Sequence, residues 1–428
     1  MVDYPPDDGY IQSSEKGVYM ITRKIASKFV CALSDSPVVL LHGARQTGKS
    51  TLIKYLIKNK HHADYVTLDD SAVLSAAINN PESFIESFEG NAAIDEVQRA
   101  PELFLAIKKN IDKQRKPSKF ILAGSANVLL LPKISESLAG RIELLTLYPF
   151  AQNEIAKSNF NLINSLFDKK LKRLEIPNSN IEIIKKIVYG GYPEIQDRKN
   201  EERRNAWFKS YITTILQRDV RDISNIEGLT QLPRLLSLMG ARVGSLLNST
   251  EFSRSAGIPQ TTLKRYINLL ESTFMIYLLP AYSGNLSKRL IKTPKIYLYD
   301  TGLLSHLISA DEKRLRNDPH LLGSIIENFV LMELIKQASW SNSVFNFFHF
   351  RTSSGQEVDF VIERNDGTLI GIEVKAAHSP RAEMFKGLKV LSEETGKNFF
   401  KGFLFYNGDS LIQFDKNLFA IPIKYLWI

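Results

Sequence analysis

The feature that most constrains this chain is a glycine-containing segment that directly follows an apolar run. The segment reads Gly43-Ala44-Arg45-Gln46-Thr47-Gly48-Lys49-Ser50 and matches the pattern G-x-x-x-x-G-K-[ST] at every defined position. The apolar run 37–42 before it predicts a buried strand, and a helical pattern begins after it at Thr51. Because such a loop lets backbone N–H groups surround phosphates, this order predicts a nucleoside triphosphate site.

Individual roles within this loop follow from the side chains. We expect residues 43–51 to bind the nucleotide, which is most naturally ATP with Mg²⁺. Lys49 would neutralise the β and γ phosphate oxygens, and the Ser50 hydroxyl would bind Mg²⁺. The alternative is a tight glycine turn without a ligand, but the strand before the loop and the helix after it favour the nucleotide.

An acidic pair directly follows a later apolar run. Asp95 and Glu96 follow Ala92-Ala93-Ile94. At the end of a neighbouring buried strand, Asp95 would hold Mg²⁺ and Glu96 would polarise the attacking water as a general base. Acidic residues also end strands at protein surfaces. The position of this pair after the phosphate loop is what favours a role in the nucleotide site.

Three more residues are candidates for contact with the γ-phosphate. Ser125 and Asn127 follow the apolar run 120–123, where either side chain could sense the phosphate or belong to a plain turn. Arg141 precedes the apolar run 143–147 and could serve as an arginine finger, within its own subunit or toward a neighbour, or could form a structural salt bridge. The predicted catalytic residues are Lys49, Glu96, Ser125, Asn127 and Arg141.

A helix-turn-helix pattern lies in the middle of the chain. One helical pattern stops at Gly257, a short turn contains Pro259, and a second helix would bury Leu263 and Leu270. The outward N-terminal half of this second helix is where a recognition helix meets DNA, and its predicted contacts are Gln260, Thr261, Thr262, Lys264 and Arg265. The apolar run 274–279 could begin a β wing. In the alternative, the module packs against the rest of the protein and never contacts DNA.

Carboxylates and a lysine gather in the last hundred residues. Glu327 falls in a helical stretch, Asp359 on an alternating strand pattern, and Glu373 and Lys375 two residues apart on the next strand, where they share a face. A hairpin would bring these side chains together. Metal-assisted phosphodiester cleavage uses two carboxylates and a lysine, although structural ion pairs use the same side chains. The spacing resembles the PD-(D/E)xK nuclease pattern.

Taken together, several motifs resemble one known family. They are the phosphate loop, the segments AIDEVQRAPELF, LAGSAN and SLAGR, the following LYPFAQNE, and GGYPE at 190–194. The chain resembles the bacterial and archaeal AAA-type ATPases that carry a C-terminal domain of unknown function, DUF4143. This resemblance implies an ATPase followed by a winged helix and a domain similar to PD-(D/E)xK nucleases, and it spans nearly the whole chain.

The fold class expected is α/β, because short apolar runs alternate with helical patterns and so predict a parallel sheet covered on both faces. A chain of 428 residues exceeds one average domain. We expect an N-terminal segment and helix at 1–35, a P-loop ATPase domain at 36–155, a helical region at 156–240, a winged helix-turn-helix at 241–300, and an α/β nuclease-like domain at 301–428.

Charge and composition bear on partners and compartment. The formal net charge of +9 favours a polyanionic partner such as DNA, although a basic proteome would give the same value. Cys31 has no second cysteine to pair with, which favours a reducing cytoplasm, and the sequence has no signal peptide pattern and no apolar run that could span a membrane.

Two hypotheses follow for the function. The first is a DNA-associated ATPase that acts as an ATP-gated nuclease. The second is a nucleotide-dependent switch that binds a protein partner through an inactive nuclease-like domain. The oligomeric state stays open, and with it whether Arg141 acts in cis or in trans.

Overall fold

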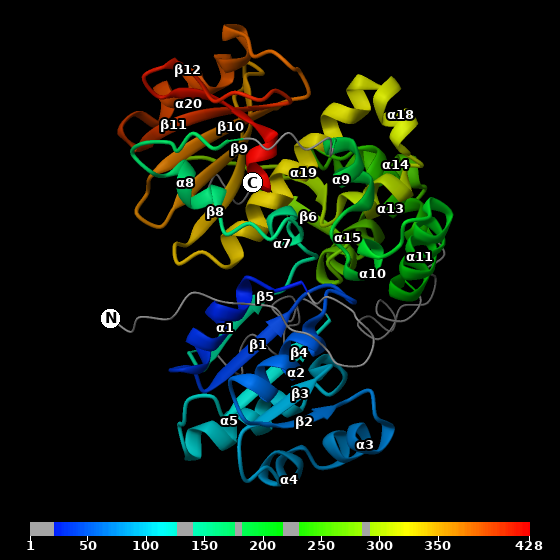
Figure 1. Ribbon diagram of the computed structural model, residues 1–428. Coiled ribbons are helices and arrows are strands. Elements are labelled where there is room, and N and C mark those ends of the chain that lie inside the picture. The colour runs from blue at the N-terminus through cyan, green and yellow to red at the C-terminus, as the bar shows by residue number, and fades with distance from the viewer. Residues whose placement is uncertain (1–20, 126–139, 176–181, 217–230, 285–291) are drawn as a thin grey trace.

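The computed structural model describes residues 21–125, 140–175, 182–216, 231–284 and 292–428. Three parts follow one another along the chain (Figure 1). A parallel sheet with helices on both sides forms the lower part of the view, and a second sheet lies at the upper left. Most of a helical middle part lies at the upper right, while its helix α8 (Leu162–Leu166) lies beside the second sheet. Asn127 and residues 137–139, which belong to two of the predicted motifs, lie outside the described residues.

The N-terminal sheet is parallel and has the strand order β2-β3-β4-β1-β5. Its strands match the predicted apolar runs: β1 Val38–His42, β2 Asp64–Thr67, β3 Ala92–Asp95, β4 Phe120–Gly124 and β5 Ile142–Thr146. The helices around it are α1 Ile25–Leu33, α2 Lys49–Asn59, α3 Ser71–Asn79, α4 Pro81–Glu86 and α5 Leu103–Lys113, with a 3-10 turn at Val97–Arg99. The predicted α/β class is confirmed.

Both faces of this sheet are buried, which explains why its strands are apolar without alternation. Val38 and Leu40 point toward α3, α4 and α5, whereas Val39 and Leu41 point toward α1 and α2. The side chains on the two faces thus form two separate apolar clusters. Because parallel strands end at a common edge, the loop after β1 and the acidic end of β3 meet on the same side of the sheet.

The middle part is helical up to a small hairpin. Its helices are α7 Gln152–Ile155, α8 Leu162–Leu166, α9 Ile183–Tyr189, α10 Pro193–Gln196, α11 Glu201–Thr214, α13 Leu232–Ala241, α14 Ser249–Ala256 and α15 Gln260–Ser272. α14 ends at Gly257, which has a φ of 67°, and α15 buries Leu263 and Leu270 as predicted. The antiparallel strands β6 Ile276–Leu279 and β7 Lys295–Leu298 follow.

The C-terminal sheet has the strand order β12-β13-β11-β10-β9-β8. Its strands are β8 Phe345–Arg351, β9 Glu357–Arg364, β10 Leu369–Lys375, β11 Phe399–Tyr406, β12 Ile412–Asp415 and β13 Leu418–Pro422. The helices from the hairpin onward are α17 Thr301–Leu307, α18 Glu312–Asn317, α19 Pro319–Ser339 and α20 Lys386–Thr395, with 3-10 turns at Ala382–Phe385, Gly396–Asn398 and Ile423–Leu426. α19 covers one face of the sheet and α20 covers the other.

The helix α19 is buried nearly all round and links the parts of the molecule. Its polar side chains Asn328, Glu333, Lys336 and Gln337 are all buried. A helix with this burial lies inside a core rather than at a surface. None of the helices within the described ranges has the length and apolar character needed to cross a membrane.

Candidate nucleotide and carboxylate sites

The phosphate loop joins β1 to α2, as the sequence predicts. Lys49 is the first residue of α2, and Gly48 before it has a φ of 95°. Gly43 has a φ of 152°, and a Cβ on it would lie 2.2 Å from the backbone oxygen of Leu147. The first glycine is therefore required because the loop passes directly against the chain that leaves β5.

Lys49 is buried inside this loop. Its ammonium group donates to the backbone oxygens of Gly43, over 2.9 Å, and of Ala44, over 2.8 Å. The hydroxyl of Thr47 donates to the same Ala44 oxygen over 2.9 Å. The lysine thus lies at the centre of the loop, where a phosphate held by the loop would meet it.

Asp95 ends β3 as a buried carboxylate with both oxygens engaged. Its Oδ2 accepts from the hydroxyl of Tyr65 over 2.7 Å, and its Oδ1 accepts from the backbone N–H of Glu96 over 3.0 Å. Burial, together with Asp95, raises the pKa of Tyr65. A tyrosine from β2 therefore holds the carboxylate of Asp95 at the edge of the sheet where the phosphate loop lies.

Glu96, the predicted general base, is held by two neighbours. Its carboxylate accepts from the hydroxyl of Ser125 over 3.2 Å and from the side-chain amide of Gln98. Gln98 in turn accepts from the backbone N–H of Ser125 over 3.2 Å. The backbone of Glu96 has a φ of 57°, a conformation that costs energy for a side chain of this kind and that recurs at functional sites.

Arg141 lies at the other end of the sheet. It precedes β5, its backbone oxygen accepts from the N–H of Val38 at the start of β1, and its guanidinium pairs with Asp112 over 2.7 Å. The phosphate loop follows the far end of β1, about 16 Å away at the usual rise per residue. Of the two alternatives open for Arg141, this position disfavours contact with the nucleotide of the same chain. Contact with a neighbouring subunit's nucleotide stays a prediction.

A buried arginine that the sequence reasoning missed connects the phosphate loop to the rest of the molecule. Arg23 donates to the backbone oxygen of Thr47 over 2.8 Å and to that of Tyr148 over 2.6 Å. Its Nε lies 3.2 Å from the carboxylate of Glu154, and the two side chains are 9% and 1% exposed. Glu154 also accepts from the backbone N–H of Ala151 over 2.9 Å.

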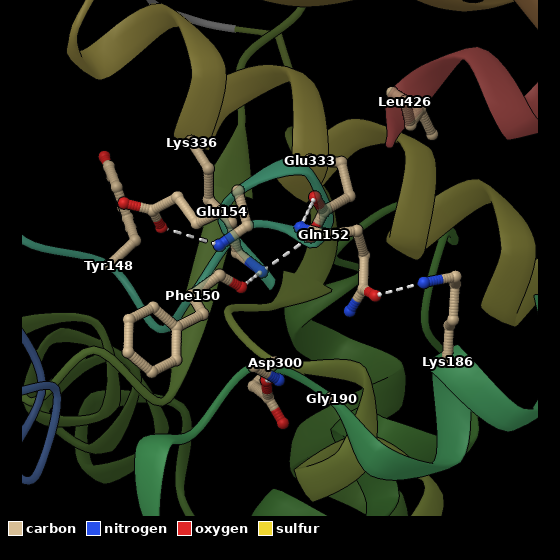
Figure 2. A network of polar contacts seen from close by, with 12 residues as sticks. Tyr148, Phe150, Gln152, Glu154, Lys186, Gly190, Asp300, Glu333, Lys336 and Leu426 are labelled. Carbon is tan, nitrogen blue, oxygen red and sulfur yellow. Dashed lines mark hydrogen bonds and ion pairs between the residues drawn. The ribbon is translucent and has the colours of Figure 1, made fainter. Parts of the chain in front are cut away.

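The segment that carries these groups continues into a polar junction with α19 (Figure 2). The backbone N–H of Gln152 donates to Glu333 over 2.6 Å, and Lys336 donates to the backbone oxygen of Phe150 over 3.1 Å. Glu333 and Lys336 also pair with each other over 2.8 Å. The chain leaving β5 is thus fixed to the middle of α19 by buried charged groups.

The glycine pair of the GGYP motif belongs to the same junction. The N–H of Phe150 donates to the oxygen of Gly191 over 2.7 Å, and the N–H of Gly191 donates to Asp300 over 2.7 Å. A Cβ on Gly190 would lie 2.3 Å from Asp300, and one on Gly191 would lie 2.2 Å from the Phe150 oxygen. Only glycines allow this close approach.

The C-terminal carboxylates and lysine meet as predicted from the hairpin β9–β10 and from α19. Lys375 lies 2.9 Å from Glu373, and Asp359 accepts from the backbone N–H of Val374 over 2.8 Å. Burial raises the pKa of Glu373 to about 8, and the carboxylate of Asp359 adds to this shift. Burial and the same neighbour raise the pKa of Glu327 to about 7.

A second lysine, which sequence reasoning missed, enters this cluster from β7. The ammonium group of Lys295 lies 2.5 Å from Glu357, 3.3 Å from Glu327 and 3.9 Å from Asp359. Tyr297, on the same face of β7, donates to Glu327 over 2.5 Å. Burial alone would lower the pKa of Lys295, but the surrounding carboxylates raise it overall. In the sequence, Lys295 and Tyr297 stand on either side of the apolar Ile296. This alternation was the signal that could have placed both side chains on one face of a strand.

These carboxylates have the oxygen chemistry that Mg²⁺ prefers, but their arrangement does not fit an ion. Among the described residues, no three acidic, histidine or cysteine side chains are spaced to hold a metal. The ammonium group of Lys295 lies within 4 Å of both Glu327 and Asp359. A protein cation thus takes the position between them.

The predicted DNA-contacting residues lie on the surface of α15. Gln260, Thr261, Lys264 and Arg265 are exposed, and Thr262 is partly buried. The order α14, α15 and the hairpin β6–β7 places a helix-turn-helix before a hairpin. DNA contact and the winged-helix assignment stay predictions.

Strand order, phosphate loop and acidic pair together define a P-loop ATPase. A family model for an AAA domain agrees with this class over residues 35–156. Two further models match the rest of the chain: a domain of unknown function (DUF8612) at 181–314 and a domain of unknown function (DUF4143) at 322–426. The chain belongs to the family of P-loop ATPases that carry a C-terminal DUF4143 domain.

Relatives extend over most of the chain. An uncharacterized protein of Mycobacterium tuberculosis is 30% identical over 359 residues, which are 84% of this chain and 74% of that protein. An uncharacterized protein of Methanocaldococcus jannaschii is 25% identical over 375 residues, 83% of this chain and 78% of that protein. The solved Walker-type ATPase of Pyrococcus abyssi is 14% identical with a TM-score of 0.40, over 67% of this chain and 96% of that one. The match to this solved structure leaves a third of the present chain uncovered.

Proposed function

We propose that this ATPase acts on DNA and that its nucleotide state gates a nuclease site in the C-terminal domain. The observation that supports the gate is that α19 serves both sites. It carries Glu327 in the carboxylate cluster and, about 9 Å further along the helix, Glu333 in the junction with the ATPase domain. A displacement of α19 by the ATPase domain would therefore move a carboxylate of the second site.

In the ATPase site, this chain's own residues divide the work. Lys49 and the loop backbone bind the phosphates, and Glu96, fixed by Ser125 and Gln98, orients and activates water. Ser50 and Asp95 would hold Mg²⁺, because Ser50 follows the loop lysine and Asp95 ends β3 at the same edge of the sheet, with its carboxylate held by Tyr65. When bound, Mg²⁺ would neutralise part of the negative charge on the phosphates.

For the C-terminal site, the proposed substrate is a phosphodiester backbone. Lys375 presents a cation next to Glu373, where the pair can orient a water and stabilise developing negative charge. Basic charge over the whole chain and the exposed cations Lys264 and Arg265 support DNA as the polymer. In the arrangement described, Lys295 occupies the carboxylate cluster, so cleavage requires a second arrangement.

A cleavage assay tests this proposal. Supercoiled and linear DNA are incubated with Mg²⁺ or Mn²⁺, with and without ATP, using wild type, Lys375→Ala and Lys49→Ala. We expect DNA cleavage only by proteins that retain Lys375. Cleavage by the wild type should change when ATP is added, and this change should be absent in Lys49→Ala. Lys389→Ala, which removes an exposed lysine of α20, is the matched control and should cleave normally. Intact DNA with every protein, while ATP is still consumed, would contradict the nuclease.

Intact DNA would favour a second candidate, a nucleotide-dependent switch with an inactive nuclease-like domain. The engagement of Lys295 by three carboxylates is the observation that favours it, since ion pairs alone would then explain the cluster. The expected result is a protein partner that the wild type retains with ATP and that Lys49→Ala retains equally with or without ATP. Absence of any nucleotide-dependent partner would count against it.

A further inference from the structure

Lys295 reaches the carboxylate cluster from a different part of the chain than the carboxylates themselves. Glu327, Glu357 and Asp359 lie on α19 and β9, whereas Lys295 begins β7 in the hairpin of the middle part. The residue is only 3% exposed. A buried lysine of this kind is stable only because carboxylates compensate its charge.

The backbone around Lys295 is fixed on both sides. It pairs with Leu279 of β6, and on the other side the N–H of Gly244 donates to the Ile296 oxygen over 2.8 Å while Ile296 donates to Ser245 over 3.0 Å. The ammonium group can therefore leave the cluster only by rotation of its side chain or by movement of the whole hairpin.

We propose that Lys295 is the built-in counter-ion of the carboxylate cluster and that it and a divalent metal ion exclude each other there. This inference rests on the proposed nuclease function and names its regulation. Mg²⁺ needs oxygen ligands at about 2.0–2.1 Å, so an ion bound by Glu327 and Asp359 would compete with the ammonium group for the same carboxylate oxygens. Repulsion between the two cations in a buried site adds to this competition.

Both partners of the Lys295–Glu327 contact are fixed to the segment that leaves β5. On one side, Asp300 follows β7 by two residues and binds Gly191, which binds Phe150. On the other side, Glu333 of α19 binds Gln152. Figure 2 shows the contact of Gln152 with Glu333, with Asp300 lower in the view.

Arg23 connects that segment to the phosphate loop through Thr47, Tyr148 and Glu154. A change in the shape of the loop would therefore reach β7 and α19 by two separate routes. Because the routes end on opposite partners of the Lys295–Glu327 contact, unequal movement would open or close that contact. This places Lys295 as the element through which nucleotide state controls metal entry.

Direct measurement of Mn²⁺ binding to the full chain tests this inference. Titrations by electron paramagnetic resonance, without nucleotide and in an Asp95→Asn background, report the C-terminal site. We expect Lys295→Gln to bind one additional Mn²⁺ at least about tenfold more tightly than Lys295-containing protein, since a competing charge is removed. The gain should vanish when Glu327→Gln is added. Lys295→Arg, which keeps a cation, and Lys292→Gln, which removes a nearby exposed one, should show no gain.

Equal Mn²⁺ affinity in Lys295→Gln and its parent, or a weaker one in Lys295→Gln, would overturn the assignment. If Lys295→Gln fails to fold, the wild type itself supplies the test: saturating Mn²⁺ should increase acylation of Lys295 detected by mass spectrometry, and unchanged labelling with Mn²⁺ bound would overturn it. Cleavage is scored separately. Tighter Mn²⁺ binding without DNA cleavage would overturn the nuclease but leave the role of Lys295 intact.

Discussion

At the scale of single residues, the nucleotide site depends on a hydroxyl outside its motifs. Tyr65 donates to Asp95 over 2.7 Å. A carboxylate held in this way is oriented before an ion arrives, and outer partners of metal ligands commonly contribute one to two orders of magnitude to metal affinity. We therefore expect Tyr65 to position Asp95 for Mg²⁺.

Tyr65→Phe should raise the Mg²⁺ concentration needed for half-maximal ATP hydrolysis by about tenfold, because Asp95 loses its donor. ATP binding without Mg²⁺ should be unchanged, as measured with a fluorescent ATP analogue. Tyr55→Phe in α2 is the control and should behave as wild type. An unaltered Mg²⁺ requirement in Tyr65→Phe would show that Asp95 is positioned without it.

His42, directly before the phosphate loop, predicts a pH effect on stability. Burial, with the nearby charge of Lys49, lowers its pKa from 6.5 to about 4, and its ring bonds to Thr146 over 2.8 Å. The unfolded chain therefore binds a proton between pH 6.5 and 4 that the folded chain does not. Its contribution to stability is complete above pH 6.5 and falls by about 3 kcal/mol as the pH drops toward 4.

Urea unfolding at a series of pH values measures this. The free energy of unfolding of wild type minus that of His42→Asn should rise from pH 4 to 6.5 and then level off. His320→Asn, at an exposed position, is the control and should give a flat difference. A flat difference for His42→Asn as well would mean that His42 does not stay neutral in the folded protein.

At the scale of elements, the junction between the GGYP turn and the chain leaving β5 depends on backbone approach. Gly191 accepts a hydrogen bond from Phe150 at a separation that leaves no room for a Cβ. By contrast, a Cβ on Gly323 in α19 would meet no atom within 4 Å. A methyl group therefore fits at Gly323 but not at Gly191.

Gly191→Ala should lower the free energy of unfolding by about 3 kcal/mol or more, because its Cβ collides with a backbone oxygen that cannot move away. Gly323→Ala should raise it by up to roughly 1 kcal/mol through helix propensity. Chemical denaturation measures both. Similar stabilities for the two variants would show that the turn relaxes more easily than its contacts indicate.

At the scale of the whole molecule, two bodies are joined by polar contacts and by the aromatic pairs Tyr148–Tyr299 and His42–Phe274. The middle and C-terminal parts share one apolar cluster that runs from α8 to the last residues, across the boundary expected at residue 300. The N-terminal sheet has two apolar clusters of its own. Since buried polar junctions have fewer alternative arrangements than apolar cores, they suit the transmission of a defined movement.

The proposed DNA binding gives one more expected outcome at this scale. Replacing Lys264 and Arg265 together by alanine should weaken duplex DNA binding by about tenfold at moderate salt and reduce the salt slope by about one for each phosphate that is no longer neutralised. Filter binding over a salt series measures both quantities. The control removes Lys386 and Lys389, two exposed lysines of α20, and should change neither. Equally weakened binding in both variants would indicate only a general charge effect.

Local pattern was sufficient for much of this protein. The strands of the parallel sheet, the phosphate loop, the end of β3 and the helix-turn-helix follow from periodicity and turn residues, because these depend on neighbours within a few positions. The meeting of Glu373 with Lys375 also follows, since alternate residues of a strand share a face. The family's domain arrangement followed from motifs spread along the chain.

Only the tertiary structure decided which distant side chains meet. Arg23 and Glu154 are 131 residues apart, and Lys295 and Glu327 are 32 apart on separate parts of the fold. The same holds for Arg141. The sequence shows only that it precedes a strand, and the direction of that strand in the sheet places it at the edge opposite the phosphate loop. Periodicity determines which face a side chain occupies, whereas its partner on that face depends on the packing of whole elements against one another.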